Sequence, residues 1–336
     1  MTSKRLATFF LAAVSALLMA LPFAPAVSAA QNARASVRVV VAPDGSGDFR
    51  TIQQAIDHAP PEGDGRLIIA IQPGIYHERL TVPQDRARTT FVGLGKDPAS
   101  TVVTYSMSAA AAGGTFFSST VDVEASDFEA SNLTFENSFG PGSQAVALSI
   151  HSDRAILRRC RLIGWQDTLY AASGRQYYDH CYIEGAIDFI FGNARAIFDH
   201  CEIHTSGAGY IAAESRTTPD GLGGFVFNRC KLTTGDAEKK SYLGRPWRRY
   251  SRVVYIDCWM GTQIRRRGWD NWRNPANEKT AWFGEYHSTG PGANPGQRVP
   301  WARQLSAAQA AAFRPQKFLA KPDGWDPVAG ARSKLQ

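Results

Sequence analysis

Short segments in which apolar and polar residues alternate recur through the middle of the chain. In five of these segments a cysteine comes directly after a polar residue, and an apolar residue stands two positions after the cysteine. In a sixth segment Leu133 takes the place of the cysteine. A period of two predicts half-buried β-strands. The cysteines of the five segments are Cys160, Cys181, Cys201, Cys230 and Cys258.

These strands recur every 20 to 29 residues, with no helical pattern between them. Such a repeat predicts a solenoid, in which each turn buries its inward residues against the next turn. The unequal intervals disfavour a propeller and favour an all-β fold, a right-handed parallel β-helix whose corner loops differ in length. The cysteines should form an interior stack, with coils about 4.8 Å apart. That spacing allows a disulfide, for which Cys181–Cys201 is the candidate; the alternative is that all five are small buried apolar residues.

Helical patterns occur near the two ends of the repeat region, where a solenoid needs short capping helices. Thr51 should be the N-cap of the first helix, with the Gln54 side chain bonding back to it as a capping box. The apolar residues of 52–59 fall on one helical face, which we expect to cover the first coil. A second, alanine-rich helix should open at 306–309. We expect one catalytic domain over 31–336.

The first thirty residues have the pattern of a secretory signal peptide. Lys4 and Arg5 precede an apolar run over 6–21, and small residues suited to cleavage follow at 27–29. A membrane anchor is the alternative, but about 20 apolar residues are needed to span a bilayer, and the apolar run over 6–21 is shorter. We therefore expect residues 1–30 to be removed and the enzyme to be secreted, either extracellular or periplasmic, with no membrane association afterwards. No long pro-region is expected before the repeats.

Charge is informative mainly about partners. Removing the signal segment would lower the net charge from +7 to +5, because that segment holds two basic residues and no acidic one. A basic exported protein suits an anionic partner, although surplus surface arginine is an equally simple explanation. The densest basic clusters are 265–267 and 248–249. Neither has the pattern of a nucleic-acid-binding module, and the spacing of cysteine and histidine predicts no metal site.

Two aspartates occupy equivalent places in successive repeats. Asp167 lies seven residues after one cysteine and Asp188 seven residues after the next, and Gly164 and Gly185 also match. The two carboxylates should therefore be neighbours on one face. Carboxylates so close cannot both ionise freely, so that one can hold a proton while the other stays charged. The alternatives are a solvated aspartate ladder or a calcium site, which would need more acidic ligands than Glu184 nearby.

The segments around these aspartates resemble the pectin methylesterases. The matching motifs follow in order along the chain: GIYHE at 74–78, QAVAL at 144–148, GWQDTLY at 164–170, GAIDFIFG at 185–192, LGRPW at 243–247 and WFGEY at 282–286. The resemblance runs from Val39 to Trp325. It implies an enzyme that hydrolyses the C6 methyl esters of homogalacturonan to polygalacturonate and methanol. It implies pectin as partner, no cofactor, and a monomer.

The resemblance also implies roles for individual residues. Asp188 matches the nucleophile and Asp167 the general acid and base, while Arg245 should hydrogen-bond to Asp188. The pKa of Asp188 should then fall and that of Asp167 should rise. Gln166 and Gln144 match amides that stabilise the oxyanion, for which neutral donors are well suited. The positions that match substrate contacts are Trp247, Tyr170, Phe191 and Thr115.

Several alternatives stay open at this stage. Phe191 either contacts the substrate or packs in the core. Trp269 and Trp272 are either cleft residues or structural ones. His180 and His200 share one phase of the repeat, which favours a surface or corner stack, and we assign no histidine a catalytic role. Ser149 stands where family members often have arginine.

Rival functions also stay open. They are a pectate or pectin lyase, a thioesterase-like enzyme, and a non-catalytic polysaccharide-binding β-helix. A binding protein has no need for two aspartates together with an arginine, which favours an enzyme.

Overall fold

The computed structural model describes residues 36–60 and 65–329, which belong to one compact unit. The predicted signal peptide, 1–30, lies outside the described residues. No helix within these residues is long and apolar enough to cross a membrane.

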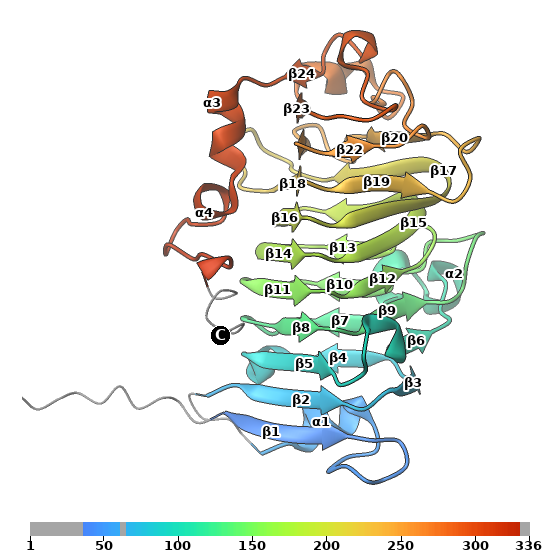
Figure 1. Cartoon of the computed structure of the whole chain (residues 1–336), viewed down its shortest axis with the longest axis vertical. Helices are drawn as coiled ribbons and strands as arrows, with labels where there is room; N and C mark the ends of the chain where they lie inside the picture. Colours follow the sequence, from blue (N-terminus) through green and yellow to red (C-terminus); the bar gives the residue numbers. More distant parts are fainter. Residues whose placement is uncertain (1–35, 61–64, 330–336) are drawn as a thin grey trace, which may run out of the picture. The chain divides into compact units, whose positions relative to one another are not determined.

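Parallel strands stacked coil upon coil make up this unit (Figure 1). The first sheet has one strand from each coil, and every pairing in it is parallel. Its strands in spatial order are β1 (Val37–Val41), β2 (Leu67–Ile71), β5 (Thr89–Gly93), β8 (Glu129–Ser131), β11 (Ala155–Arg158), β14 (Arg175–Asp179), β16 (Arg195–Asp199), β18 (Gly224–Asn228), β21 (Arg252–Ile256), β23 (Trp282–Tyr286) and β24 (Arg303–Gln304).

Two further faces are joined into one sheet by the long strands β15 (Tyr182–Gly192) and β17 (Glu202–Glu214), which bend from one face to the other. The first halves of these two strands lie on the same face as β3 (Gly74–His77), β6 (Thr101–Tyr105), β9 (Thr134–Asn137), β12 (Arg161–Ile163), β19 (Lys231–Thr234) and β22 (Trp259–Met260). Of these, β12 pairs with β15 and β19 pairs with β17. The second halves of β15 and β17 lie on the same face as β4 (Leu80–Val82), β7 (Val121–Val123), β10 (Leu148–Ile150), β13 (Leu169–Ala171) and β20 (Ser241–Gly244). This confirms the prediction of a parallel β-helix.

The sequence repeat corresponds to a corner of the coil. The residue before each cysteine, and before Leu133, has a left-handed backbone with φ between 49° and 59°. A single residue of this kind turns the chain sharply from the first sheet to the second. Left-handed backbone costs about 1–2 kcal/mol for a residue with a side chain, which the hydrogen bonds between coils offset. The corner residues are Asn132, Arg159, His180, His200, Arg229 and Asp257.

Identical registers stack like side chains on one another inside the coils. Tyr178, Phe198, Phe227 and Tyr255 are in register on four successive strands of the first sheet, and neighbouring rings are stacked with centroids 4.4 to 4.7 Å apart. Such offset aromatic contacts add to the stabilisation from burial alone.

The cysteines form the expected interior stack, but the predicted disulfide Cys181–Cys201 is wrong. All five cysteines are free and at most 1% exposed. In-register parallel strands hold equivalent side chains parallel at about the coil spacing, whereas a disulfide needs Cβ atoms about 3.5–4.5 Å apart. The thiols instead donate to backbone carbonyls: the Cys201 thiol lies 3.4 Å from Tyr178 O and 3.5 Å from Asp199 O.

The first helix, α1 (Ile52–His58), contacts β1, β2 and β4 at the N-terminal end of the stack, as predicted. Thr51 is its N-cap and accepts from the Gln54 amide at 3.2 Å. The expected reciprocal bond from the Gln54 side chain is not formed. The Glu78 carboxylate accepts from the amides of Ile52 and Gln53 instead, each at 3.0 Å.

The second predicted helix forms but does not cap an end. Ser306 and Gln309 make a complete capping box before α3 (Ala307–Ala310), and α4 (Pro315–Phe318) follows. Figure 1 shows both helices alongside the first sheet. Phe313 and Phe318 pack there against outward side chains such as Val226 and Val254. The remaining short helices are α2 (Ala109–Ala112) and the 3₁₀ turns η1 (Gln84–Arg86), η2 (Pro98–Ser100), η3 (Thr115–Phe117), η4 (Pro275–Lys279), η5 (Pro295–Gln297) and η6 (Ala311–Phe313).

Candidate active site

The two aspartates lie side by side where β15 bends. Leu169 pairs with Ile190 in the parallel register of β13 and β15, which places Asp167 opposite Asp188 on neighbouring coils. The Asp167 amide donates to Ile187 O at 3.0 Å. Both aspartates have left-handed backbones, with φ of 64° and 49°, and are 9% and 6% exposed. Strained backbone of this kind is concentrated at functional sites.

The matching glycines allow this bend. A Cβ at Gly185 would lie 2.3 Å from the Cβ of Phe189 and 2.8 Å from the Thr168 hydroxyl. At Gly164, a Cβ would lie 2.7 Å from that same hydroxyl. Any larger residue would therefore push the corner outward, together with the aspartate three residues further on.

Arg245 holds one of the two carboxylates. Its Nε donates to Asp188 Oδ1 at 2.8 Å and its Nη2 to Oδ2 at 2.6 Å, the predicted contact in bidentate form. The guanidinium lies between two aromatic rings, 3.7 Å from the Tyr210 centroid and 3.8 Å from that of Trp272. Two cation–π contacts and two charge-assisted hydrogen bonds thus fix the arginine, and through it the nucleophile candidate.

The electrostatics agree with the sequence prediction for Asp167 but not for Asp188. Burial, reinforced by the charge of Asp188, raises the pKa of Asp167 to about 8. Burial also raises the pKa of Asp188, because desolvation outweighs the hydrogen bonds and the charge of Arg245. The expected fall was wrong because it counted the arginine and not the burial. Since Arg245 bonds to Asp188, the proton shared by the pair belongs on Asp167.

Both predicted oxyanion residues reach the same cavity. Gln144, Gln166 and Ile187 are backbone neighbours on three successive coils. The two glutamine side chains line a cavity of about 300 Å³ together with both aspartates. Neither side-chain amide has a hydrogen-bond partner among residues 36–60 and 65–329, so both are free to donate to a ligand.

The predicted substrate residues surround this cavity unequally. Trp247, Phe191 and Thr115 line it. Phe191 is only 4% exposed and packs beside Val146, so it combines the cleft and core positions that the sequence left as alternatives. Tyr170 lies one layer away, stacked on Phe191 with centroids 4.7 Å apart.

Three aromatic residues of the site were missed or left undecided. Trp272 lines the cavity and stacks on Arg245, whereas Trp269 is a core residue with 1% exposure. Tyr210 was missed altogether, although its place one coil after Ile187 could have indicated it. Phe116 also lines the cavity and is 47% exposed; its position next to Thr115 was the available signal.

A buried carboxylate supports the segment that carries Arg245 and Trp247. Glu214 is fully buried, and its oxygens accept from the amides of Arg216 at 3.1 Å and Arg252 at 2.6 Å. Burial raises its pKa to about 7. Its backbone carbonyl also accepts from the Trp247 amide. Glu214 therefore ties the segment 247–252 to β17 at both ends, through Trp247 and Arg252.

Ser149 belongs to a polar group beside the cavity. Its hydroxyl lies 2.8 Å from His151 Nε2, which is also 3.3 Å from Asp122 Oδ1. The Asp122 carboxylate raises the pKa of His151. This is not a nucleophilic triad, because that arrangement needs the serine and the aspartate on different ring nitrogens.

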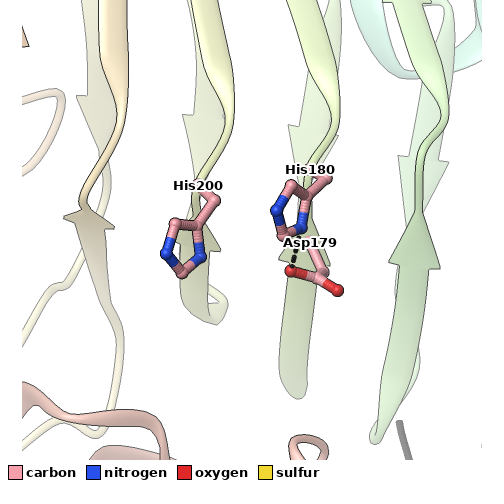
Figure 2. A group of neighbouring side chains, drawn as sticks. All are labelled: Asp179, His180 and His200. Atoms are coloured by element: carbon pink, nitrogen blue, oxygen red, sulfur yellow. Dashed lines mark hydrogen bonds and ion pairs between the residues drawn. The ribbon is translucent and has the colours of Figure 1, made fainter.

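The corner histidines form the expected stack. His180 and His200 are parallel, with ring centroids 4.9 Å apart (Figure 2). Their side chains and Asp179 offer possible metal ligands within 4.8 Å of one another, a grouping that the sequence did not indicate. Each Nδ1 faces the preceding aspartate, at 2.7 Å for Asp179 and 3.2 Å for Asp199. Parallel rings at this separation do not point two nitrogen lone pairs at one ion.

A buried carboxylate pair with a guanidinium on one member can hold one group charged and the other protonated, an arrangement suited to the hydrolysis of an ester. The Pectinesterase family model matches residues 38–322. Pectinesterase 31 of Arabidopsis thaliana is 43% identical over 297 residues, which are 85% of this chain and 93% of the relative.

Solved structures agree. Pectin methylesterase from carrot has a TM-score of 0.81 at 35% identity, covering 84% of this chain and 92% of the carrot chain. A pectin methylesterase in complex with a hexasaccharide has a TM-score of 0.73 at 29% identity, covering 86% and 98%. The chain belongs to the pectinesterase family and is a carboxylic-ester hydrolase with pectin methylesterase activity.

Proposed function

We propose that this enzyme hydrolyses the C6 methyl esters of pectin through an acyl-enzyme, with Asp188 as nucleophile and Asp167 as general acid and base. The observation that carries the proposal is the asymmetry of the pair. Arg245 bonds to Asp188 through both oxygens, while no guanidinium within 36–60 and 65–329 forms an ion pair with Asp167. One carboxylate is thus held charged and aimed, and the other holds a proton.

In the first step an Asp188 oxygen attacks the ester carbonyl carbon. The bond from that carbon to the methoxy oxygen breaks, and Asp167 gives its proton to the departing methanol. The oxyanion formed on the way accepts hydrogen bonds from Gln144 and Gln166, whose side-chain amides have no other partner in the part of the chain that the structure describes. Donors already in place stabilise the developing charge without reorganisation.

In the second step water attacks the acyl carbon and gives a proton to the Asp167 carboxylate. The bond between the acyl carbon and the Asp188 oxygen breaks, which restores both aspartates and leaves a galacturonic acid unit that ionises in solvent. The aromatic side chains of Trp247, Tyr170, Phe191 and Phe116 offer flat faces for the apolar C–H surfaces of the sugar rings. Thr115 is the remaining proposed contact.

The location and assembly of the enzyme belong to the same proposal. The pattern of residues 1–30 supports export with cleavage, so that the enzyme meets pectin outside the cytoplasm. We expect a monomer without membrane attachment. Size-exclusion chromatography with light scattering of the mature chain tests the monomer.

Methanol release from methylated pectin tests the chemistry. Asp188→Ala should lower kcat by about 10⁴-fold or more, as loss of a nucleophile typically does, while pectin affinity stays within about threefold. Asp85→Ala, which removes an exposed aspartate far along the chain, is the matched control and should keep the wild-type rate. A full rate in Asp188→Ala would exclude this nucleophile, and an unsaturated uronide product without methanol would indicate a lyase instead.

The pH dependence offers a second test. The rate requires Asp167 protonated and Asp188 charged, so the alkaline limb of kcat/KM should fall through pH values near 8, where Asp167 loses its proton. Asp167→Asn should remove most of the activity and with it this limb. An alkaline limb unchanged in the residual activity would assign the titration to another group.

A further inference from the structure

Three arginines, which we call the arginine row, cross the coils of the first sheet at the start of its strands. They are Arg175, Arg195 and Arg252. Arg175 pairs in register with Arg195, and Arg195 with Gly224. Arg252 begins β21, which pairs with β18 in the same register, so it stands opposite Gly224. Neighbouring strands are about 4.8 Å apart, so roughly 10 Å separates the Cα atoms of Arg195 and Arg252.

The protein neutralises the first member of the arginine row. Arg175 Nη2 lies 2.6 Å from Asp153 Oδ2 and donates to Asp323 Oδ2 at 2.9 Å. Asp323 belongs to the C-terminal segment, which packs on the outer side of this sheet. A guanidinium removed from water normally has such partners, because an unpaired charge is costly to bury.

The other two members have no acidic partner. Arg195 and Arg252 are half-buried, and neither forms an ion pair with any residue of 36–60 or 65–329. Arg195 Nε and Nη1 are buried and have no hydrogen-bond partner among these residues, while the guanidinium carbon lies 4.8 Å from the centre of the Phe318 ring. The side chain of Arg252 forms no hydrogen bond in the described part of the chain either. Buried donors without a partner are uncommon in proteins and point to an additional ligand.

The charges that surround these two arginines are mostly positive. Burial and the charge of Arg175 lower the pKa of Arg195. Burial and the charge of Arg216 lower the pKa of Arg252 to about 10. Glu214 acts in the opposite direction, but its oxygens already accept from two backbone amides, and burial raises its own pKa to about 7. Both arginines are therefore still cations at neutral pH, with little negative charge to balance them.

Gly224 leaves space between the two unpaired arginines. A Cβ at this position would lie 3.0 Å from Arg252 Cδ, closer than to Arg252 Cβ. The side chain of Arg252 therefore leans over the glycine, towards the coil of Arg195. A small ligand above Gly224 would lie between the two guanidinium groups.

We propose that Arg195 and Arg252 bind a small tetrahedral oxyanion, of the class of inorganic sulfate and phosphate, on the outer side of the first sheet. Two guanidinium groups match the charge of a divalent anion, and each can donate to it through two nitrogens. The anion thus does for these two residues what a pair of aspartates does for Arg175. The site is separate from the catalytic cavity, so the inference does not depend on the proposed function.

The first test is the effect of the anion on the melting temperature. The mature protein is heated at pH 7 in sodium sulfate or sodium phosphate at about 10 mM, and in NaCl of the same ionic strength. Each oxyanion should raise the melting temperature by about 3–8 °C relative to NaCl, the shift expected when its concentration is about 10 to 100 times Kd. Isothermal titration calorimetry with sodium sulfate should show one site per chain.

Variants assign the effect to the two arginines. Arg195→Gln/Arg252→Gln should lose both the shift and the calorimetric site. In NaCl alone it should melt no lower than the wild type, because it removes two unpaired cations from a half-buried position. The control is Arg265→Gln/Arg266→Gln, which removes two exposed cations elsewhere and should keep the full shift.

A single substitution keeps the test decisive if the double variant does not fold. Arg252→Gln leaves the contact between Arg195 and Phe318 in place and should bind sulfate about 10-fold more weakly or worse. Unchanged sulfate affinity in Arg252→Gln would overturn the inference. So would a wild type that responds to neither oxyanion, or a shift that is lost in the control and kept in Arg195→Gln/Arg252→Gln.

Discussion

Replacing Asp167 by asparagine should make the stability of the enzyme less dependent on pH. The asparagine keeps the shape of the protonated acid but cannot ionise. In the wild type the buried carboxyl titrates near pH 8, against 3.8 for an ordinary aspartate. The folded state therefore holds this proton more tightly than the unfolded state does. Its contribution to stability is complete below about pH 4 and is lost as the pH rises towards 8.

The size of the effect follows from the difference between the two pKa values. Each pH unit between them lowers the free energy of unfolding by about 1.4 kcal/mol. The wild type should thus lose roughly 3 kcal/mol from this group between pH 5 and pH 7, a loss that Asp167→Asn does not suffer. The variant should gain that amount relative to the wild type over the same interval.

Denaturant unfolding followed by tryptophan fluorescence at pH 5, 6 and 7 measures the difference. Asp85→Asn, at an exposed position, is the control and should differ from the wild type by a constant amount. A difference between Asp167→Asn and the wild type that stays constant with pH would refute the reasoning, since it would mean that Asp167 is already ionised at pH 5 in the folded enzyme.

Three further changes probe the supports of the site. Arg245→Lys keeps the charge but loses the bidentate fork and the aromatic sandwich, so kcat should fall about 10- to 100-fold and the acid limb of the pH–rate profile should move to higher pH. Trp272→Ala should lower kcat/KM about 3- to 30-fold by removing one face of that sandwich, with Trp272→Phe close to wild type in steady-state assays. Ellman's reagent should label none of the five buried thiols in the native protein and all five in denaturant.

The fold could be predicted because its repeat is local. A single left-handed residue before each cysteine, and before Leu133, ends one strand and starts the next, so the corner leaves a phrase of three or four residues in six successive coils. The strands of the first sheet have no comparable repeated phrase in the sequence. Its position against the C-terminal helices depends on outward apolar residues such as Val226, whose partners lie about 90 residues away in sequence.

The active site was predictable to the extent that it shares this repeat. Equal offsets put Asp167 and Asp188 together because the coils are in register. Tyr210 was missed although it lies in β17 in register with Ile187, and Trp272 was left undecided, because the path of the loop that carries it cannot be read from the repeat. The pKa of Asp188 was wrong for a related reason: burial is a property of the whole cleft and cannot be counted from a list of neighbours.

The burial of the two aspartates also affects how the product leaves the active site. In the mechanism proposed above, each turnover leaves a galacturonic acid unit against the charged Asp188, in a cavity where both aspartates are at most 9% exposed and charge is poorly solvated. Ionisation of that unit inside the cavity would add a second negative charge. Two anions so placed repel each other strongly, which favours release of the unit just converted.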